Sequence, residues 1–175
     1  AKGAALGTNT EMKYEVIHGL YNVLPNETLS RVMHKNLERV GGVKYSDKDR
    51  EFATEILKTY PNVKVSLESA NQIAPFVVRE KGTGGSTDVG DVSWAVPTAG
   101  MSSATWVPGT GAHSWQAVAA GGMSIGKKGM MVAAKTIALT AIDIYNNPSV
   151  RDFTYFISLS PLIFYQFQYQ PLFRS

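Results

Sequence analysis

Residues 130–145 read MMVAAKTIALTAIDIY, and this stretch says most about the fold. It consists largely of good helix formers. Its apolar side chains recur every three or four residues and so share one helix face. These side chains are Met131, Ala134, Ile137, Ala138, Ala141, Ile142 and Tyr145. Asn146-Asn147-Pro148 follows, and proline cannot continue a helix. We therefore predict an amphipathic helix over 130–145.

Two further helices are predicted upstream, over 26–40 and 46–60. Asn26 can cap the first helix, which Gly41-Gly42 would end. Ser46 and Asp49 have the spacing of a reciprocal capping box at the start of the second, and Pro61 marks its end. The apolar stripes are Leu29, Val32, Met33, Leu37 and Val40 in the first helix, and Phe52, Ala53, Ile56, Leu57 and Tyr60 in the second.

Between the helices, several short stretches favour strands. They lie near residues 14–18, 62–67, 73–78, 92–96 and 103–107. Glycine concentrates at 81–85, which favours a loop because glycine adopts backbone angles closed to other residues. Residues 108–129 are a second glycine-rich stretch, and its first part, 108–114, is also expected to be a loop. Helices that alternate with short strands indicate an α/β fold.

Composition excludes several classes of protein. The chain of 175 residues has no cysteine, so it has neither a disulfide framework nor a thiolate metal site. The net charge is +3 and the basic residues are scattered, which does not favour nucleic-acid binding. The first residues contain no apolar core of a signal peptide, and we expect a cytoplasmic protein.

The last stretch, 151–175, is aromatic and nearly uncharged. A membrane span, an edge strand and a non-native tail are the alternatives. Pro161, Pro171 and three glutamines oppose the span.

Three histidines are candidates for chemistry. His34 lies in a helix pattern beside Met33 and Lys35, and His18 has no carboxylate partner at ligand spacing, so we expect a structural role for each. His113 lies in the loop Pro108-Gly109-Thr110-Gly111-Ala112-His113-Ser114, where a neutral imidazole can bind a zinc-like ion. From the residues alone, a structural role for His113 remains open.

Two carboxylates, Asp88 and Asp91, stand three residues apart in Ser86-Thr87-Asp88-Val89-Gly90-Asp91-Val92-Ser93. They fit a metal-ligand pair or a pair that supports ligands. The alternative, which the residues alone favour, is a turn in which Asp88 caps its own backbone.

Longer motifs carry a resemblance to a known family. They are 84–94 (GGSTDVGDVSW), Pro97-Thr98, 104–110 (ATWVPGT), 112–116 (AHSWQ) and 21–29 (YNVLPNETL). Together with the helix 129–145 they resemble the aminobenzoyl-glutamate hydrolase branch of the di-metal aminoacylase/carboxypeptidase metallopeptidases, over roughly residues 3–147.

This resemblance implies an α/β catalytic domain with an inserted α+β lid domain. Residues 1–22 would end the lid, which carries dimer contacts, 23–147 would form the C-terminal part of the catalytic domain, and 148–175 would be an atypical tail. The implied activity is hydrolysis of p-aminobenzoyl-glutamate, a folate breakdown product, or a related acyl-amino acid.

The resemblance also assigns roles to residues. His113 would bind one of two zinc or manganese ions, and Asp88 and Asp91 would position ligands or a loop. Gly109, Thr110 and Gly111 would face the carboxylate end of the substrate. The general base and most metal ligands come from the missing N-terminal half in this family, so no catalytic residue is assigned here. We expect an inactive fragment that needs its missing half or another protein chain, as a homo- or hetero-oligomer. A remnant domain that only folds and associates is the alternative.

Overall fold

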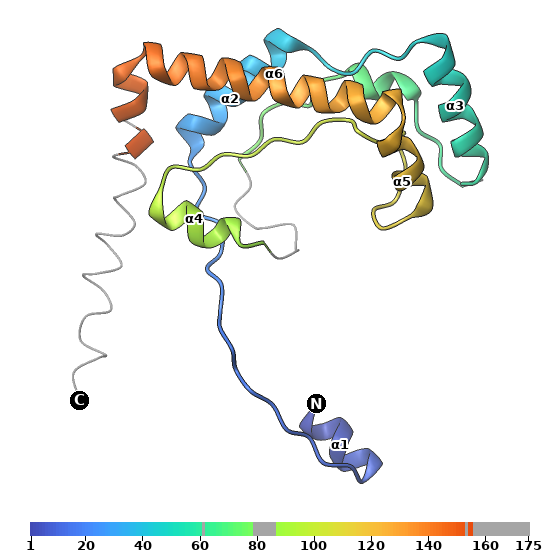
Figure 1. Cartoon of the computed structure of the whole chain (residues 1–175), viewed down its shortest axis with the longest axis vertical. Coiled ribbons are helices and arrows are strands. Elements are labelled where there is room, and N and C mark those ends of the chain that lie inside the picture. The colour runs from blue at the N-terminus through green and yellow to red at the C-terminus, as the bar shows by residue number, and fades with distance from the viewer. Residues whose placement is uncertain (61, 79–86, 153, 156–175) are drawn as a thin grey trace.

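The computed structural model describes residues 1–60, 62–78, 87–152 and 154–155. Within these ranges it contains α1 (Lys2–Thr8), α2 (Glu27–Val40), α3 (Asp47–Lys58), the 3-10 helix η1 (Leu67–Asn71), α4 (Val89–Ala95), α5 (Trp115–Gly122) and α6 (Ser124–Asn146). Figure 1 shows these helices joined by long irregular segments. The predicted loop 81–85 and the tail from 156 onward lie outside the described residues.

Helix α6 is the longest element, and both α2 and α5 pack against it. Helix α2 buries Leu29 and Met33, which both belong to its predicted apolar stripe. Its buried Asn36 donates a hydrogen bond to Asp143 Oδ2 on α6 (2.7 Å). A buried amide is costly unless it is hydrogen-bonded, so this contact fixes how α2 lies on α6.

The hydrophobic core forms where α3, α5 and the start of α6 meet. Its buried members are Ala53, Ile56, Val107, Ala120 and Ile125. Val107 belongs to an irregular segment, and the other four come from helices. The core thus joins pieces of chain that are far apart in sequence, so α3 is held by tertiary packing and not by helix propensity alone.

The predicted helix caps at Asn26, Gly41 and Ser46 are confirmed. Asn26 accepts the Leu29 N–H at 3.0 Å, and Gly41 ends α2 with a φ of 80°. Ser46 and Asp49 form the predicted capping box of α3. These local signals depend on hydrogen bonds within a few residues, which explains why the sequence alone reveals them.

The glycine-rich stretch 108–129 is irregular up to residue 114, and α5 and the first turns of α6 occupy the rest of it. The glycines there serve close packing. A Cβ on Gly129 would lie 2.6 Å from the Ala104 carbonyl oxygen, and one on Gly126 would strike the Gly121 carbonyl. Glycine therefore lets α6 approach neighbouring backbone directly.

The predicted strand at 92–96 is also wrong, because α4 (Val89–Ala95) covers most of it. The stretches 14–18, 62–67, 73–78 and 103–107 form no strand either, and Leu67 begins η1. The described residues hold no strand at all, so the α/β class is not confirmed. A strand exists only when a neighbouring backbone pairs with it, which single-sequence patterns cannot supply.

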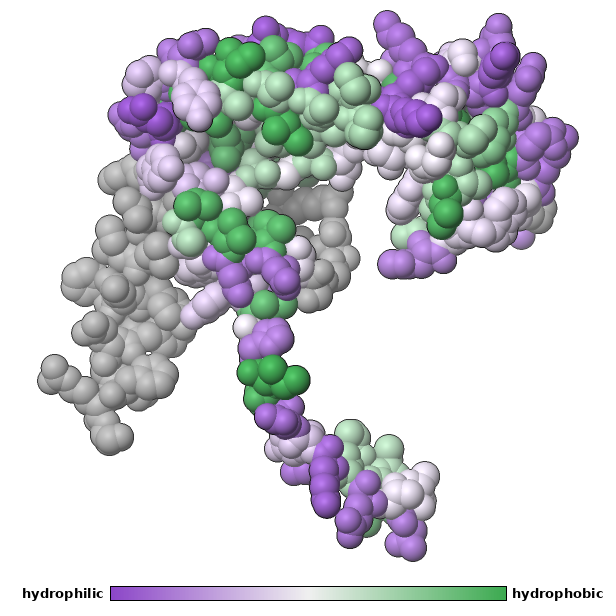
Figure 2. All heavy atoms as spheres, viewed as in Figure 1, coloured by the Kyte–Doolittle hydropathy of each residue, from purple (hydrophilic) through white to green (hydrophobic). Residues whose placement is uncertain are grey.

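The N-terminal region stands away from the rest. In Figure 1 residues 9–22 run as one extended arm from α1 to the body. Helix α1 buries no residue. Tyr14, Val16 and Ile17 on the arm are 70%, 79% and 82% exposed. Figure 2 shows this arm projecting from the body with apolar residues along it.

The start of the predicted tail packs on the body. Residues 148–152 are helical, and the Asn26 side chain donates to the Thr154 carbonyl oxygen at 3.0 Å. Thr154 is buried. Among the described residues, no helix has both the length and the apolar character that crossing a bilayer requires.

Candidate functional site

The glycine loop 108–114 has a backbone that other residues would not allow. Gly109 has a φ of 86°, and a Cβ there would collide with the Val63 side chain. The Thr110 N–H donates to the Val107 carbonyl (3.0 Å) and closes the turn. The requirement for glycine at 109 thus comes from both its backbone angle and its close approach to Val63.

His113 lies at the end of this loop, directly before α5. Its φ is 59°, in the left-handed region that side chains other than glycine seldom adopt. The next residue, Ser114, caps α5 by accepting the Ala117 N–H (3.2 Å), and it donates to the Gly111 carbonyl (2.7 Å). The imidazole is exposed. The backbone that carries His113 is therefore fixed from both sides, whereas its side chain faces solvent.

The Thr110 hydroxyl is buried and makes no hydrogen bond with any described residue. Leaving a buried hydroxyl without a partner costs about 1–3 kcal/mol. Such a group is found where a ligand or another part of the protein supplies the missing partner. The Thr110 hydroxyl is therefore available to a water, a ligand or another part of the protein.

The residues of the second candidate loop form α4 instead of a turn. Asp88 precedes the helix, is exposed, and makes no capping hydrogen bond. Thr87 Oγ1 accepts the Val89 N–H instead, at 3.3 Å. Asp91 lies in the first turn, and its Oδ1 accepts the backbone N–H of Tyr21 at 2.9 Å. The alternative in which Asp88 caps its own backbone is therefore not observed.

The structure does not bring the two candidate regions together. Figure 1 places α4 and α5 at opposite ends of the body, joined by residues 96–114. Gly109, Thr110, Gly111 and His113 share one loop at the α5 end. Within the described residues, no three side chains of the metal-binding types His, Asp and Glu gather into a cluster. His113 therefore belongs to no such cluster in the described part of the chain.

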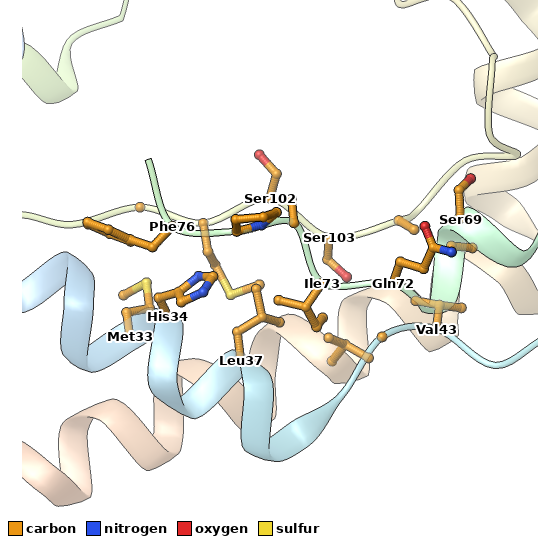
Figure 3. A pocket seen from close by; sticks show the side chains of 18 of the residues that line it. Met33, His34, Leu37, Val43, Ser69, Gln72, Ile73, Phe76, Ser102 and Ser103 are labelled. Carbon is orange, nitrogen blue, oxygen red and sulfur yellow. The ribbon is translucent and has the colours of Figure 1, made fainter. Parts of the chain in front are cut away.

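A separate cavity of about 470 Å³ lies between α2 and the segments 72–77 and 100–104. In Figure 3, Met33, His34 and Leu37 extend from α2 toward Ile73 and Phe76. The His34 ring meets the Phe76 ring at 5.5 Å, edge to face. None of the predicted site residues lines this cavity. His34 therefore packs against an apolar wall, as a structural histidine does.

Comparison with known proteins gives one informative result. The chain is 33% identical over 168 residues to one of the subunits of p-aminobenzoyl-glutamate hydrolase from Escherichia coli (strain K12). The aligned region covers 83% of this chain and 35% of the E. coli protein, so the chain spans about a third of its relative's length. No protein-family profile matches, and no solved structure is detectably similar. The resemblance predicted from the motifs is confirmed: over most of its length this chain is similar to a p-aminobenzoyl-glutamate hydrolase polypeptide.

Proposed function

We propose that this chain is the C-terminal portion of a metal-dependent amidohydrolase that cleaves p-aminobenzoyl-glutamate or a related acyl-amino acid. The observation that carries the proposal is the 33% identity, over 83% of the chain, to a protein named for that hydrolysis. The orphan hydroxyl of Thr110 supports it, because it marks the same glycine loop that the resemblance assigns to substrate binding.

In this proposal His113 contributes one ligand to a pair of zinc or manganese ions. Among the described residues, no three side chains of metal-binding types gather at one place. A catalytic zinc site needs about three protein ligands. The remaining ligands and the general base would come from polypeptide outside this chain. The contribution of His113 is to present an imidazole from a backbone that Ser114 and Gly111 hold in place.

The loop 109–111 would receive the carboxylate of the amino-acid product. Backbone N–H groups in glycine-rich turns bind anions well, because no side chain blocks their approach. Thr110 adds a hydroxyl that has no hydrogen-bond partner within the described part of the chain. A carboxylate oxygen would satisfy it.

A partner is implied by the surface of the chain. Val16 and Ile17 on the arm and Val77 and Val78 after η1 are all more than half exposed. Exposed apolar stretches of this kind are covered in functional proteins by another chain or domain. The E. coli relative is named as a subunit. We infer that this chain likewise works within an oligomer that completes both the surface and the metal site.

We predict that the isolated chain does not hydrolyse p-aminobenzoyl-glutamate, because His113 is its one matched metal ligand. The assay is release of p-aminobenzoate with zinc or manganese added. Chelator-sensitive turnover at the rate of the E. coli enzyme would contradict the prediction.

A chimera with the E. coli protein distinguishes the two hypotheses, which are a catalytic portion of a hydrolase and a domain that only folds and associates. Residues 1–147 of this chain replace the matching segment of the E. coli protein, with and without His113→Ala. The proposal expects hydrolysis by the chimera and loss of hydrolysis, together with reduced metal content, in the variant. His18→Ala is the matched control and should leave both unchanged. A chimera that folds, as judged by its melting temperature, but neither binds metal nor turns over would favour a domain that only associates.

A further inference from the structure

Three side chains of helix α4 form hydrogen bonds with the main chain of residues 21–24. Asp91 Oδ1 accepts the Tyr21 N–H at 2.9 Å. Trp94 Nε1 donates to the Asn22 carbonyl oxygen at 2.9 Å. Ser93 Oγ accepts the Leu24 N–H at 2.8 Å. Each bond joins residues about seventy positions apart in the sequence, so none of them is a local turn.

Other features of α4 also support its contact with residues 21–24. Ser93 is 1% exposed and donates its own proton to the Gly90 carbonyl (2.5 Å), which leaves its oxygen lone pairs for Leu24. A Cβ on Gly90 would overlap the Tyr21 carbonyl oxygen. The rings of Tyr21 and Trp94 lie 5.5 Å apart. Three features of α4 therefore contact the same four residues, 21–24. They are the buried hydroxyl of Ser93, the close approach at Gly90 and the ring of Trp94.

These residues are where the exposed arm joins the body. In Figure 1 the arm leaves the body beside α4. No backbone hydrogen bond among the described residues holds 11–20. The direction of the arm is consequently set at 21–24.

We propose that α4 is a clasp, in which Asp91, Ser93 and Trp94 are positioning residues that fix the direction in which the N-terminal arm leaves the body. This gives Asp91 a task other than supporting a metal ligand. It also gives a physical reason for glycine, aspartate, serine and tryptophan at 90, 91, 93 and 94. If residues 1–22 end a lid, as the family resemblance implies, the clasp sets the hinge of that lid.

The first test measures hydrogen exchange of single amides by NMR in the full chain. Removing one hydrogen bond of ordinary strength changes an opening equilibrium roughly five- to tenfold. Ser93→Ala should speed exchange of the Leu24 amide by that factor, and Asp91→Ala should do the same for the Tyr21 amide. Val92→Ala is the matched control: Val92 is exposed on the same helix, and its replacement should change neither amide.

The second test measures the direction of the arm. The chain contains no cysteine, so spin labels can be placed at Gly19→Cys and Lys135→Cys alone. Gly19 has open space around it, and Lys135 lies exposed on α6. The distance distribution should be narrow in the parent and in Val92→Ala. It should broaden in Asp91→Ala/Ser93→Ala and shift in Gly90→Ala.

Protection of amides in α6 shows whether each variant is folded. Should Ser93→Ala unfold the chain, Asp91→Ala and Trp94→Phe still test the clasp, because Asp91 is exposed and phenylalanine keeps an aromatic ring against Tyr21. Fast exchange at Tyr21 and Leu24 in the parent, or a distance distribution that the variants leave unchanged, would overturn the proposal. Neither readout involves hydrolysis, so an inactive chimera would leave this conclusion standing.

Discussion

Among individual residues, Asp49 bears the most concentrated set of polar contacts. Its buried carboxylate accepts hydrogen bonds from the Ser46 backbone and hydroxyl, both at 2.7 Å, and from Ser124 and Lys128 at the start of α6. Burial alone would raise the pKa of this carboxyl. The bonds from Lys128, Ser124 and Ser46 outweigh burial and hold its pKa well below the usual range.

We predict that Asp49→Asn destabilises the chain by about 1–3 kcal/mol, because it removes the charge of a buried carboxylate that accepts hydrogen bonds from Ser46, Ser124 and the partly exposed Lys128. Urea denaturation followed by circular dichroism measures the change. Asp47→Asn is the control: Asp47 lies exposed in the same helical turn and should cost less than about 0.5 kcal/mol. Equal effects of the two substitutions would contradict a structural role for the ion pair.

The same carboxylate predicts how stability depends on pH. Its folded pKa is depressed, so the unfolded chain binds one more proton between that pKa and the unfolded value of about 4. The stabilisation is complete above about pH 4 and is lost as pH falls below it. The parent should lose stability in this window more steeply than Asp49→Asn, by up to about 1.4 kcal/mol per pH unit. Parallel pH profiles would show that folding does not lower the pKa of Asp49.

At the scale of elements, two glycines near the α5–α6 junction have opposite roles. A Cβ on Gly129 would lie 2.6 Å from the Ala104 carbonyl and 2.8 Å from Thr105 Cγ2. A Cβ on Gly121 of α5 would meet nothing within 4 Å. The first glycine therefore allows α6 to contact the segment beneath it, and the second only lowers the stability of its own helix.

We therefore predict that alanine substitutions at these two glycines change the stability of the chain in opposite directions. Gly129→Ala should destabilise the chain by about 1–3 kcal/mol, because α6 must move away from residues 104–105. Gly121→Ala should stabilise it by up to about 1 kcal/mol through helix propensity. Both changes add one methyl group, so urea denaturation of the pair separates close packing from propensity. Stabilisation by both would mean that α6 is not held against this segment.

For the whole molecule, the prominent feature is the exposed apolar surface of the N-terminal arm. The arm exposes Tyr14, Val16 and Ile17, and none of them packs on the body. Unpaired extended backbone and exposed apolar side chains both favour association.

We predict that the chain self-associates in a concentration-dependent way, and that deleting residues 1–20 weakens this association. The arm and α1 bury no large apolar side chain, so the deletion should leave the core and its melting temperature unchanged. Sedimentation velocity over a range of concentrations provides the measurement. Deleting 156–175 tests the aromatic tail in the same way. A monomer at all concentrations, with and without the arm, would show that the body is self-sufficient.

The sequence by itself determined the helices 26–40, 46–60 and 130–145, their caps at Asn26, Ser46 and Gly41, and the relative identified by its motifs. Each of these rests on contacts within a few residues or on direct similarity, and both can be read along one chain. The role of residues 108–129 could not be read this way, because Gly126 and Gly129 resemble loop residues until the backbone that they face is known.

Only the tertiary structure decided that 89–95 is a helix, and that its Asp91, Ser93 and Trp94 hold residues 21–24 far from His113. Those hydrogen bonds join residues about seventy positions apart, and their energy is available only after the chain has brought the two segments together. The expected strands failed for the same physical reason, since a strand is stabilised by a neighbouring backbone and not by its own alternation.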